Sequence, residues 1–121
     1  MNWILVMIGG ALGAACRYGV GLLCTGLNFL SLPLGTLAVN IAGCFVLGLL
    51  TGLGQRHASI PPQILLLLTT GFCGAFTTFS TFSAETIKAM ESGHALHALV
   101  YVTISIVVGF LMFWLGKHIA A

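Results

Sequence analysis

Apolar residues fill four long runs of the chain, and short stretches rich in Gly, Pro, Asn and His separate these runs. A helix needs roughly 20 apolar residues to cross the hydrocarbon core of a bilayer. The third run continues as an amphipathic extension to residue 90, and no run is left for a second domain. We therefore expect residues 1–121 to form a single four-helix transmembrane domain, with spans at residues 3–23, 34–53, 63–83 and 97–118.

The composition points to the same class of protein. Hydrophobic residues make up 59% of the chain and charged residues only 5%, whereas soluble domains carry about 25% charged residues. A small soluble domain could not bury this much apolar surface. The net charge of +2 comes from scattered side chains, which argues against a nucleic-acid partner. The four cysteines lack C-x-x-C spacing, so we interpret them as packing residues rather than metal ligands.

The third apolar run changes character part-way along, where residues 71–83 read GFCGAFTTFSTFS. Two glycines precede five hydroxyl side chains within seven residues. In lipid, an irregular or polar segment is tolerated only where protein or a water-filled cavity surrounds it. The pattern predicts that the third helix is broken in mid-membrane, and that the broken stretch is buried and lines something.

Several side chains near this break suit a small, strongly hydrated anion. Phe79 and Phe82 share a helix face, and the positive edge of a phenyl ring can contact an anion without a fixed charge. Asn40 lies near the middle of the second span, where a polar side chain is costly unless it is paired. Asn40 taken alone favours an interhelical hydrogen bond over a place in a pathway. Tyr101 and Ser105 align on the fourth helix, where packing and pore lining are nearly equal alternatives.

Ionisable residues near the membrane are functional candidates by default, and here they are Arg17 and Glu85. Arg17 shares a face of the first helix with Gly9 and Gly13, so we expect it to face protein or water. The histidines flank the spans and are interpreted as interfacial. With two carboxylates and no nucleophile beside a base, the sequence predicts no enzyme activity.

The basic residues divide evenly between the two membrane faces. Arg56 and Lys117 belong to one side, and Arg17 and Lys88 to the other. Orientation normally follows an excess of Lys and Arg in cytoplasmic loops, and this chain has none. The balance favours insertion in both orientations and pairing as an antiparallel dimer, although a weak bias or a partner could fix one orientation.

Three segments resemble the Fluc-type fluoride channels, also called the CrcB family. They are GGALGAACRY at residues 9–18, GTLAVNIAGCF at residues 35–45 and GFCGAFTTFSTF at residues 71–82. The chain length and the number of spans agree, so the resemblance covers essentially the whole chain. It implies an all-α membrane protein with a broken third helix, assembled as a dual-topology antiparallel homodimer with two fluoride pores between the subunits.

The resemblance also implies roles for residues of the pore. Phe79 and Phe82 would be the pore phenylalanines, and Asn40 the pore amide. The remaining polar lining would be Thr81, Ser83, Tyr101 and Ser105.

Further roles implied by the resemblance lie beside the pore. Arg17 would attract the anion in an aqueous vestibule, and Glu85 would lie at a pore entrance. The backbone carbonyls of Gly74 and Thr77 would bind a structural Na⁺ at the dimer centre.

The expected function is passive export of cytoplasmic fluoride across a bacterial inner membrane. One alternative is a small multidrug-type proton-coupled exporter, which needs a membrane-embedded acid to couple protons. The first helix has no Asp or Glu to serve as that acid. The other alternative is a non-transporting scaffold subunit, which would leave the Thr, Ser and Phe cluster without a role.

Overall fold

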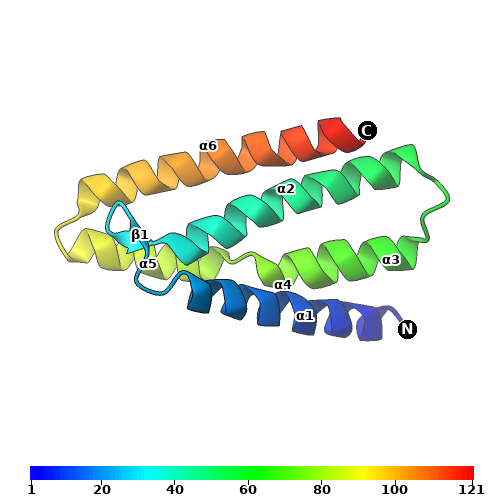
Figure 1. The fold of residues 1–121 in the computed structure, drawn as a ribbon, viewed down its shortest axis with the longest axis horizontal. Coiled ribbons are helices and arrows are strands. Elements are labelled where there is room, and N and C mark those ends of the chain that lie inside the picture. The colour runs from blue at the N-terminus through cyan, green and yellow to red at the C-terminus, as the bar shows by residue number, and fades with distance from the viewer.

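The computed structural model describes all 121 residues, which form four long helical segments that run side by side (Figure 1). Three of these segments are single helices: α1 (Asn2–Leu23), α2 (Leu34–Arg56) and α6 (Ala95–Ala120). The third segment is divided into α3 (Pro62–Leu66), η1 (Leu67–Cys73), α4 (Gly74–Phe76) and α5 (Phe79–Glu91).

All four segments are long and apolar enough to cross a membrane, as judged by length and composition. They overlap the predicted spans and extend beyond them by a few residues at several ends. The prediction of an all-α fold with four candidate spans is confirmed. One short hairpin of β1 (Asn28–Phe29) and β2 (Leu32–Pro33) interrupts the expected loop after α1. Its turn residues, Leu30 and Ser31, have positive φ angles of 51° and 64°.

The third span is irregular over much of its length, as the sequence predicts. Its π-helical part, Leu67–Cys73, was not predicted. The helix stops after α4, where Thr77 (ψ 160°) and Thr78 (ψ 119°) are extended. It starts again at Phe79 with Thr78 as the N-cap, whose Oγ1 accepts a hydrogen bond from Thr81 N–H at 3.1 Å. The break therefore lies at the two threonines, and Gly74 before it remains helical.

Close backbone packing holds the irregular span against α1. Gly9 and Gly13 lie so near η1 that an added Cβ would collide with the carbonyl oxygens of Leu67 and Phe72. In lipid, small residues allow such an approach, because packing rather than water exclusion drives helix association. These two glycines, predicted to form a contact face, therefore fix the position of the third span.

The buried core gathers at one end of the bundle, on the left of Figure 1. There the hairpin meets α5 and α6, and Leu32 and Tyr101 are almost completely buried, with 1% and 0% exposed. Many large apolar side chains elsewhere on the surface are exposed, as expected for helices that contact lipid. The core thus anchors the hairpin and α6 beside the broken helix.

Candidate functional site

Asn40 on α2 binds the backbone of the break at two points. Its Nδ2 donates to the carbonyl oxygen of Thr78 at 3.0 Å, and its Oδ1 accepts from Thr78 N–H at 2.8 Å. The extended conformation leaves Thr78 N–H without its helical acceptor, and the amide oxygen takes that place. The Thr78 carbonyl is the N-cap carbonyl of α5, so the amide N–H is an additional donor to it. Asn40 therefore makes the interhelical contact considered from the sequence, and one of its two amide N–H groups stays free for another acceptor.

Three aromatic rings follow one another from the surface of α5 to the core. Phe79 is 80% exposed, and its ring centroid lies 6.0 Å from that of Phe82. The Phe82 ring in turn stacks on buried Tyr101 at 5.6 Å. A large apolar ring this exposed at the level of the break must be covered by lipid or by another protein chain.

An open groove of about 670 Å³ passes along these rings. It lies between α2, the broken span and α6, and its lining includes both amide and hydroxyl groups. The residues that matter most for the site are Asn40, Gly74, Thr77, Phe79, Phe82 and Ser105. The groove has no wall on its outer side within this chain.

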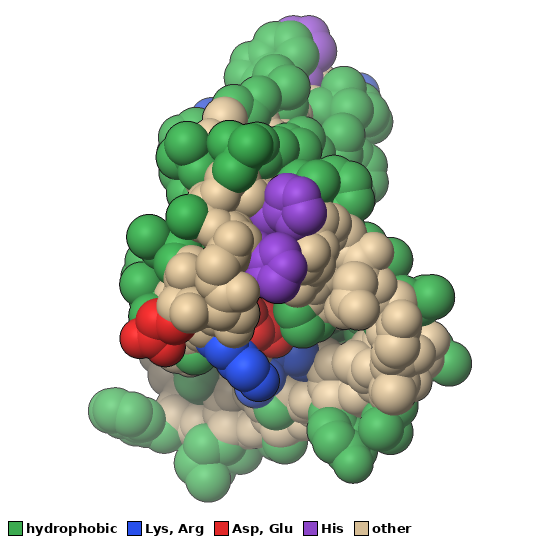
Figure 2. Space-filling view, turned by 90° about the vertical axis from the view of Figure 1, so that its left-hand side faces the viewer, with side chains coloured by type: hydrophobic (Ala, Val, Ile, Leu, Met, Phe, Trp, Pro, Cys, Tyr) green, Lys and Arg blue, Asp and Glu red, His purple; other side chains and the backbone are tan.

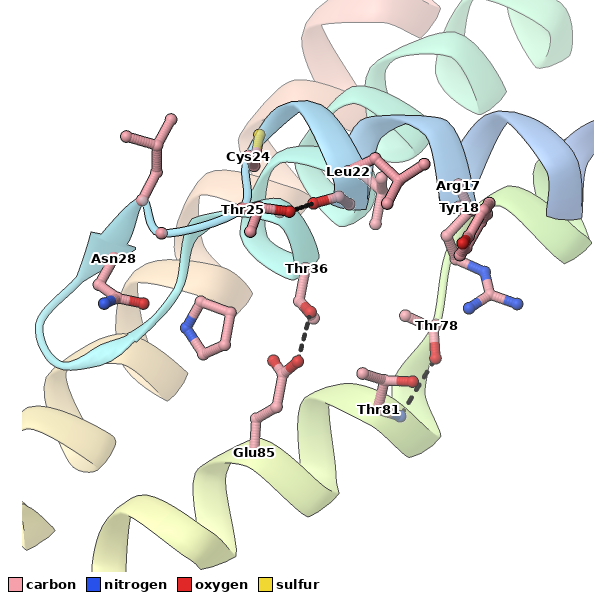
Figure 3. A pocket seen from close by; sticks show the side chains of 16 residues that line it. Arg17, Tyr18, Leu22, Cys24, Thr25, Asn28, Thr36, Thr78, Thr81 and Glu85 are labelled. Carbon is pink, nitrogen blue, oxygen red and sulfur yellow. Dashed lines mark hydrogen bonds between the residues drawn. The ribbon is translucent and has the colours of Figure 1, made fainter.

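A second cavity of about 400 Å³ lies at the core end of the bundle (Figure 3). Arg17, Thr81 and Glu85 line it, and Thr36 Oγ1 donates to Glu85 Oε1 at 3.0 Å. Arg17 Nε donates to the carbonyl oxygen of Ala75 at 3.1 Å, at the end of α4 where carbonyls lose their helical partners. The rest of the guanidinium remains available to the cavity.

Three buried side-chain oxygens near these cavities have no hydrogen-bond partner: Glu85 Oε2, Tyr101 Oη and Ser105 Oγ. Buried polar atoms are nearly always paired, so unpaired ones indicate a place for water or a ligand. Glu85 lines the smaller cavity, Ser105 lines the groove, and Thr78 lines both. Tyr101 lines neither cavity, but its ring stacks on Phe82, which lines the groove. The unpaired oxygens of Glu85 and Ser105 therefore belong to two cavities that both reach the break at Thr78.

Residues 4–117 match the family described as CrcB-like protein, Camphor Resistance (CrcB). The chain is 44% identical over 121 residues to fluoride-specific ion channel FluC 2 of Rhodococcus jostii (strain RHA1), with 100% of both chains covered. It is 41% identical over 116 residues to the fluoride-specific ion channel FluC of Acidobacterium capsulatum, with 96% of this chain and 93% of the relative covered. This chain belongs to the CrcB family. The family resemblance predicted from the sequence is confirmed, and with it the prediction that the chain is not an enzyme.

Membership of the CrcB family, together with four candidate spans, makes this chain a multi-pass membrane protein. A third bacterial relative, the fluoride-specific ion channel FluC of Geobacter sp. (strain M21), is 42% identical over 117 residues, with 97% of this chain and 94% of the relative covered. The match extends over both cavities, so the whole site belongs to the part that the family shares.

The predicted site residues do not all lie together in this CrcB-family chain. Ser83 lines neither cavity, and its hydroxyl donates to the carbonyl of Phe79 at 2.9 Å. Such bonds to the helix's own backbone are common for Ser and Thr. Gly74 and Thr77 line the groove, and no group of three or more His, Cys, Asp or Glu side chains forms a metal site.

Sequence reasoning missed two partners that the fold brings to the site. Thr36, one helical turn before Asn40, holds the Glu85 carboxylate, and a shared helix face with Asn40 was the available signal. The contact between Arg17 and Ala75 joins residues 58 positions apart, and no local sequence pattern predicts it.

Proposed function

We propose that this chain is a fluoride-selective channel through which cytoplasmic fluoride leaves passively across a bacterial inner membrane. The relatives are named as fluoride-specific ion channels. The observation that carries the proposal is the set of buried, unpartnered oxygens beside an aromatic row that reaches the surface at Phe79. Hydrogen fluoride is a weak acid that enters cells by diffusion from acidic surroundings and dissociates inside, so a passive exit for the anion is sufficient.

In this proposal, hydrogen-bond donors and ring edges replace the water around fluoride. The free N–H of Asn40 and the hydroxyls of Tyr101 and Ser105 can donate to an anion, and the edges of Phe79 and Phe82 add weak positive charge. A filter selects the ion whose size and field strength its ligands match. Short, strong contacts suit fluoride better than the larger chloride ion.

We propose that a second copy in antiparallel orientation completes the pore. A single chain supplies only a groove that is open on one side, and the exposed ring of Phe79 needs a cover. The balanced basic residues allow both orientations of insertion. Because the two copies are equivalent in an antiparallel dimer, the interface would hold two grooves and therefore two pores.

We further propose that carbonyl oxygens of Gly74 and Thr77 hold a structural Na⁺ at the centre of this dimer. Both residues line the groove beside the break, where carbonyls at a helix end lack intrahelical partners. Unwound carbonyls of broken membrane helices bind Na⁺ in transporters. Two copies would supply four oxygens, so the ion would tie the subunits together at their broken spans.

The smaller cavity is proposed as the vestibule that supplies the pore. Arg17 brings a positive charge to it, and Thr81 and the Glu85–Thr36 pair stand on the opposite side, on α5 and α2. A cation in a partly enclosed space raises the local concentration of anions. In this proposal Glu85 would stand at the pore entrance, and its unpaired oxygen would accept a hydrogen bond from water.

The deciding test is anion efflux from vesicles that contain the purified protein. A fluoride-selective electrode should record rapid release of fluoride, and a chloride electrode should record almost none from matched vesicles. Equal release of both anions would refute selectivity. Flux that needs a pH gradient would indicate the proton-coupled exporter, and the absence of any flux would favour the scaffold subunit.

A further inference from the structure

Two histidines lie together at the turn between α5 and α6. His94 is the N-cap residue of α6 and is exposed, and His97 follows within the first helical turn. Their ring centroids are 5.7 Å apart and the ring planes differ by 20°. Figure 2 looks onto this end of the molecule and shows two imidazole side chains side by side at the surface. The pair plays no part in the function proposed above.

The hairpin holds one of these rings in a defined orientation. Ser31 at its tip places Oγ 2.9 Å from His97 Nδ1. The hairpin is itself anchored by the buried side chain of Leu32. When Nδ1 carries the proton, it donates to the serine and leaves the lone pair of Nε2 free. Histidines that bind metals are oriented in this way, by a hydrogen bond from the other ring nitrogen.

We propose that His94 and His97 bind one divalent transition-metal ion of the Ni²⁺ or Zn²⁺ type, with water completing its coordination. Imidazole nitrogen is a preferred ligand of these ions. The ring centroids are 5.7 Å apart, and the Cβ–Cγ torsion of histidine is broad. Rotation of the exposed His94 ring can therefore bring its lone pair to an ion bound at His97 Nε2, while the Ser31 bond holds the His97 ring in place. Two protein ligands make an exchangeable site rather than a permanent structural one.

The neighbouring charges allow a cation at this place. Glu91 ends α5 three residues before His94, and Lys88 comes one helical turn earlier, so the charged side chains closest along the chain are one carboxylate and one ammonium group. On α6, His97 precedes Tyr101 by four residues and shares its helix face. A bound ion would therefore stand where the polar face of α6 reaches water.

Isothermal titration of the full-length protein with Ni²⁺ at about pH 7.5 tests this site, since neutral imidazoles are required. Any purification tag is removed, and Cys16→Ser removes the exposed thiol that could compete. We expect one Ni²⁺ per chain in this background. His94→Gln and His97→Gln should each weaken binding by more than about tenfold, and Ser31→Ala by about tenfold, because it loses the orienting bond.

The chain offers a matched control in His57→Gln and His118→Gln, which remove the two histidines at other positions of the sequence. These variants should bind Ni²⁺ as the parent does. The proposal is overturned if the parent does not bind Ni²⁺, or if the His94→Gln and His97→Gln double variant binds it equally tightly. Binding is measured without ion flux, so the result is independent of the proposed channel function.

Discussion

Replacing Asn40 by Ala removes both hydrogen bonds that hold the backbone of the break. The distances of 3.0 Å and 2.8 Å to the carbonyl and N–H of Thr78 are those of well-formed bonds. A typical hydrogen bond contributes about 1 kcal/mol net, whereas a buried group left without a partner costs about 1–3 kcal/mol. Thr78 lines both cavities, so water can reach part of the exposed backbone. We therefore expect a loss of about 2–4 kcal/mol in the free energy of unfolding.

A pair of variants separates this role from a general effect of removing polar side chains. Thr51→Ala on the same helix removes a hydrogen bond to the carbonyl of Leu47, which is part of the helix itself. That change should alter the free energy of unfolding by less than about 0.5 kcal/mol, as local substitutions usually do. Asn40→Asp keeps an acceptor for Thr78 N–H but sets a carboxylate oxygen against the Thr78 carbonyl, so it should be at least as destabilising as Asn40→Ala.

The assay is reversible unfolding in mixed micelles by increasing denaturing detergent, followed by circular dichroism. Fluoride efflux from vesicles is measured on the same preparations. Asn40→Ala should lose both stability and flux, because the break no longer presents a fixed lining. If Asn40→Ala unfolds with the same free energy as Thr51→Ala, the reasoning about the amide contact is wrong.

Four other substitutions test separate parts of the structure. Phe79→Ala and Phe82→Ala should nearly abolish fluoride flux while chemical cross-linking still detects the proposed dimer, and unchanged flux would contradict the proposed pore. Tyr101→Phe removes a buried hydroxyl that has no partner. The variant should keep the unfolding free energy unchanged or slightly higher, but its fluoride flux should fall several-fold. A stability loss above about 1 kcal/mol would show that the hydroxyl is already paired. Gly9→Ala places a methyl group against the carbonyl of Leu67 and should cost about 1–3 kcal/mol of unfolding free energy. Gly19→Ala is the control: its methyl group meets no atom within 4 Å, so it should cost nothing in the same denaturation series.

The sequence was sufficient to predict the four spans, because the thickness of a bilayer fixes the length of an apolar helix. It also predicted a broken third span, since hydroxyl groups and glycines at that depth need an irregular, protected backbone. It did not predict that the break lies at Thr77 and Thr78. That position depends on Asn40, which is 38 residues away and binds both backbone groups of Thr78.

Other features escaped prediction for the same reason. The π-helical stretch Leu67–Cys73 has no local signature, and it packs against glycines of α1 that come far earlier in the chain. The family resemblance implies that Ser83 belongs to the pore lining, whereas within a single chain it lines neither cavity. Helix periodicity alone does not decide whether a hydroxyl faces a cavity or its own backbone.

The two hydrogen bonds between the Asn40 amide and the Thr78 backbone have a consequence for biosynthesis. The break leaves extended backbone at Thr77 and Thr78, and lipid alone does not tolerate such backbone at membrane depth. The helix after the break also carries the charged residues Glu85, Lys88 and Glu91. Because translation proceeds from the N-terminus, α2 emerges first, and Asn40 is already in place when Thr78 arrives. We therefore expect the third span to reach its final, broken conformation only when α2 lies beside it.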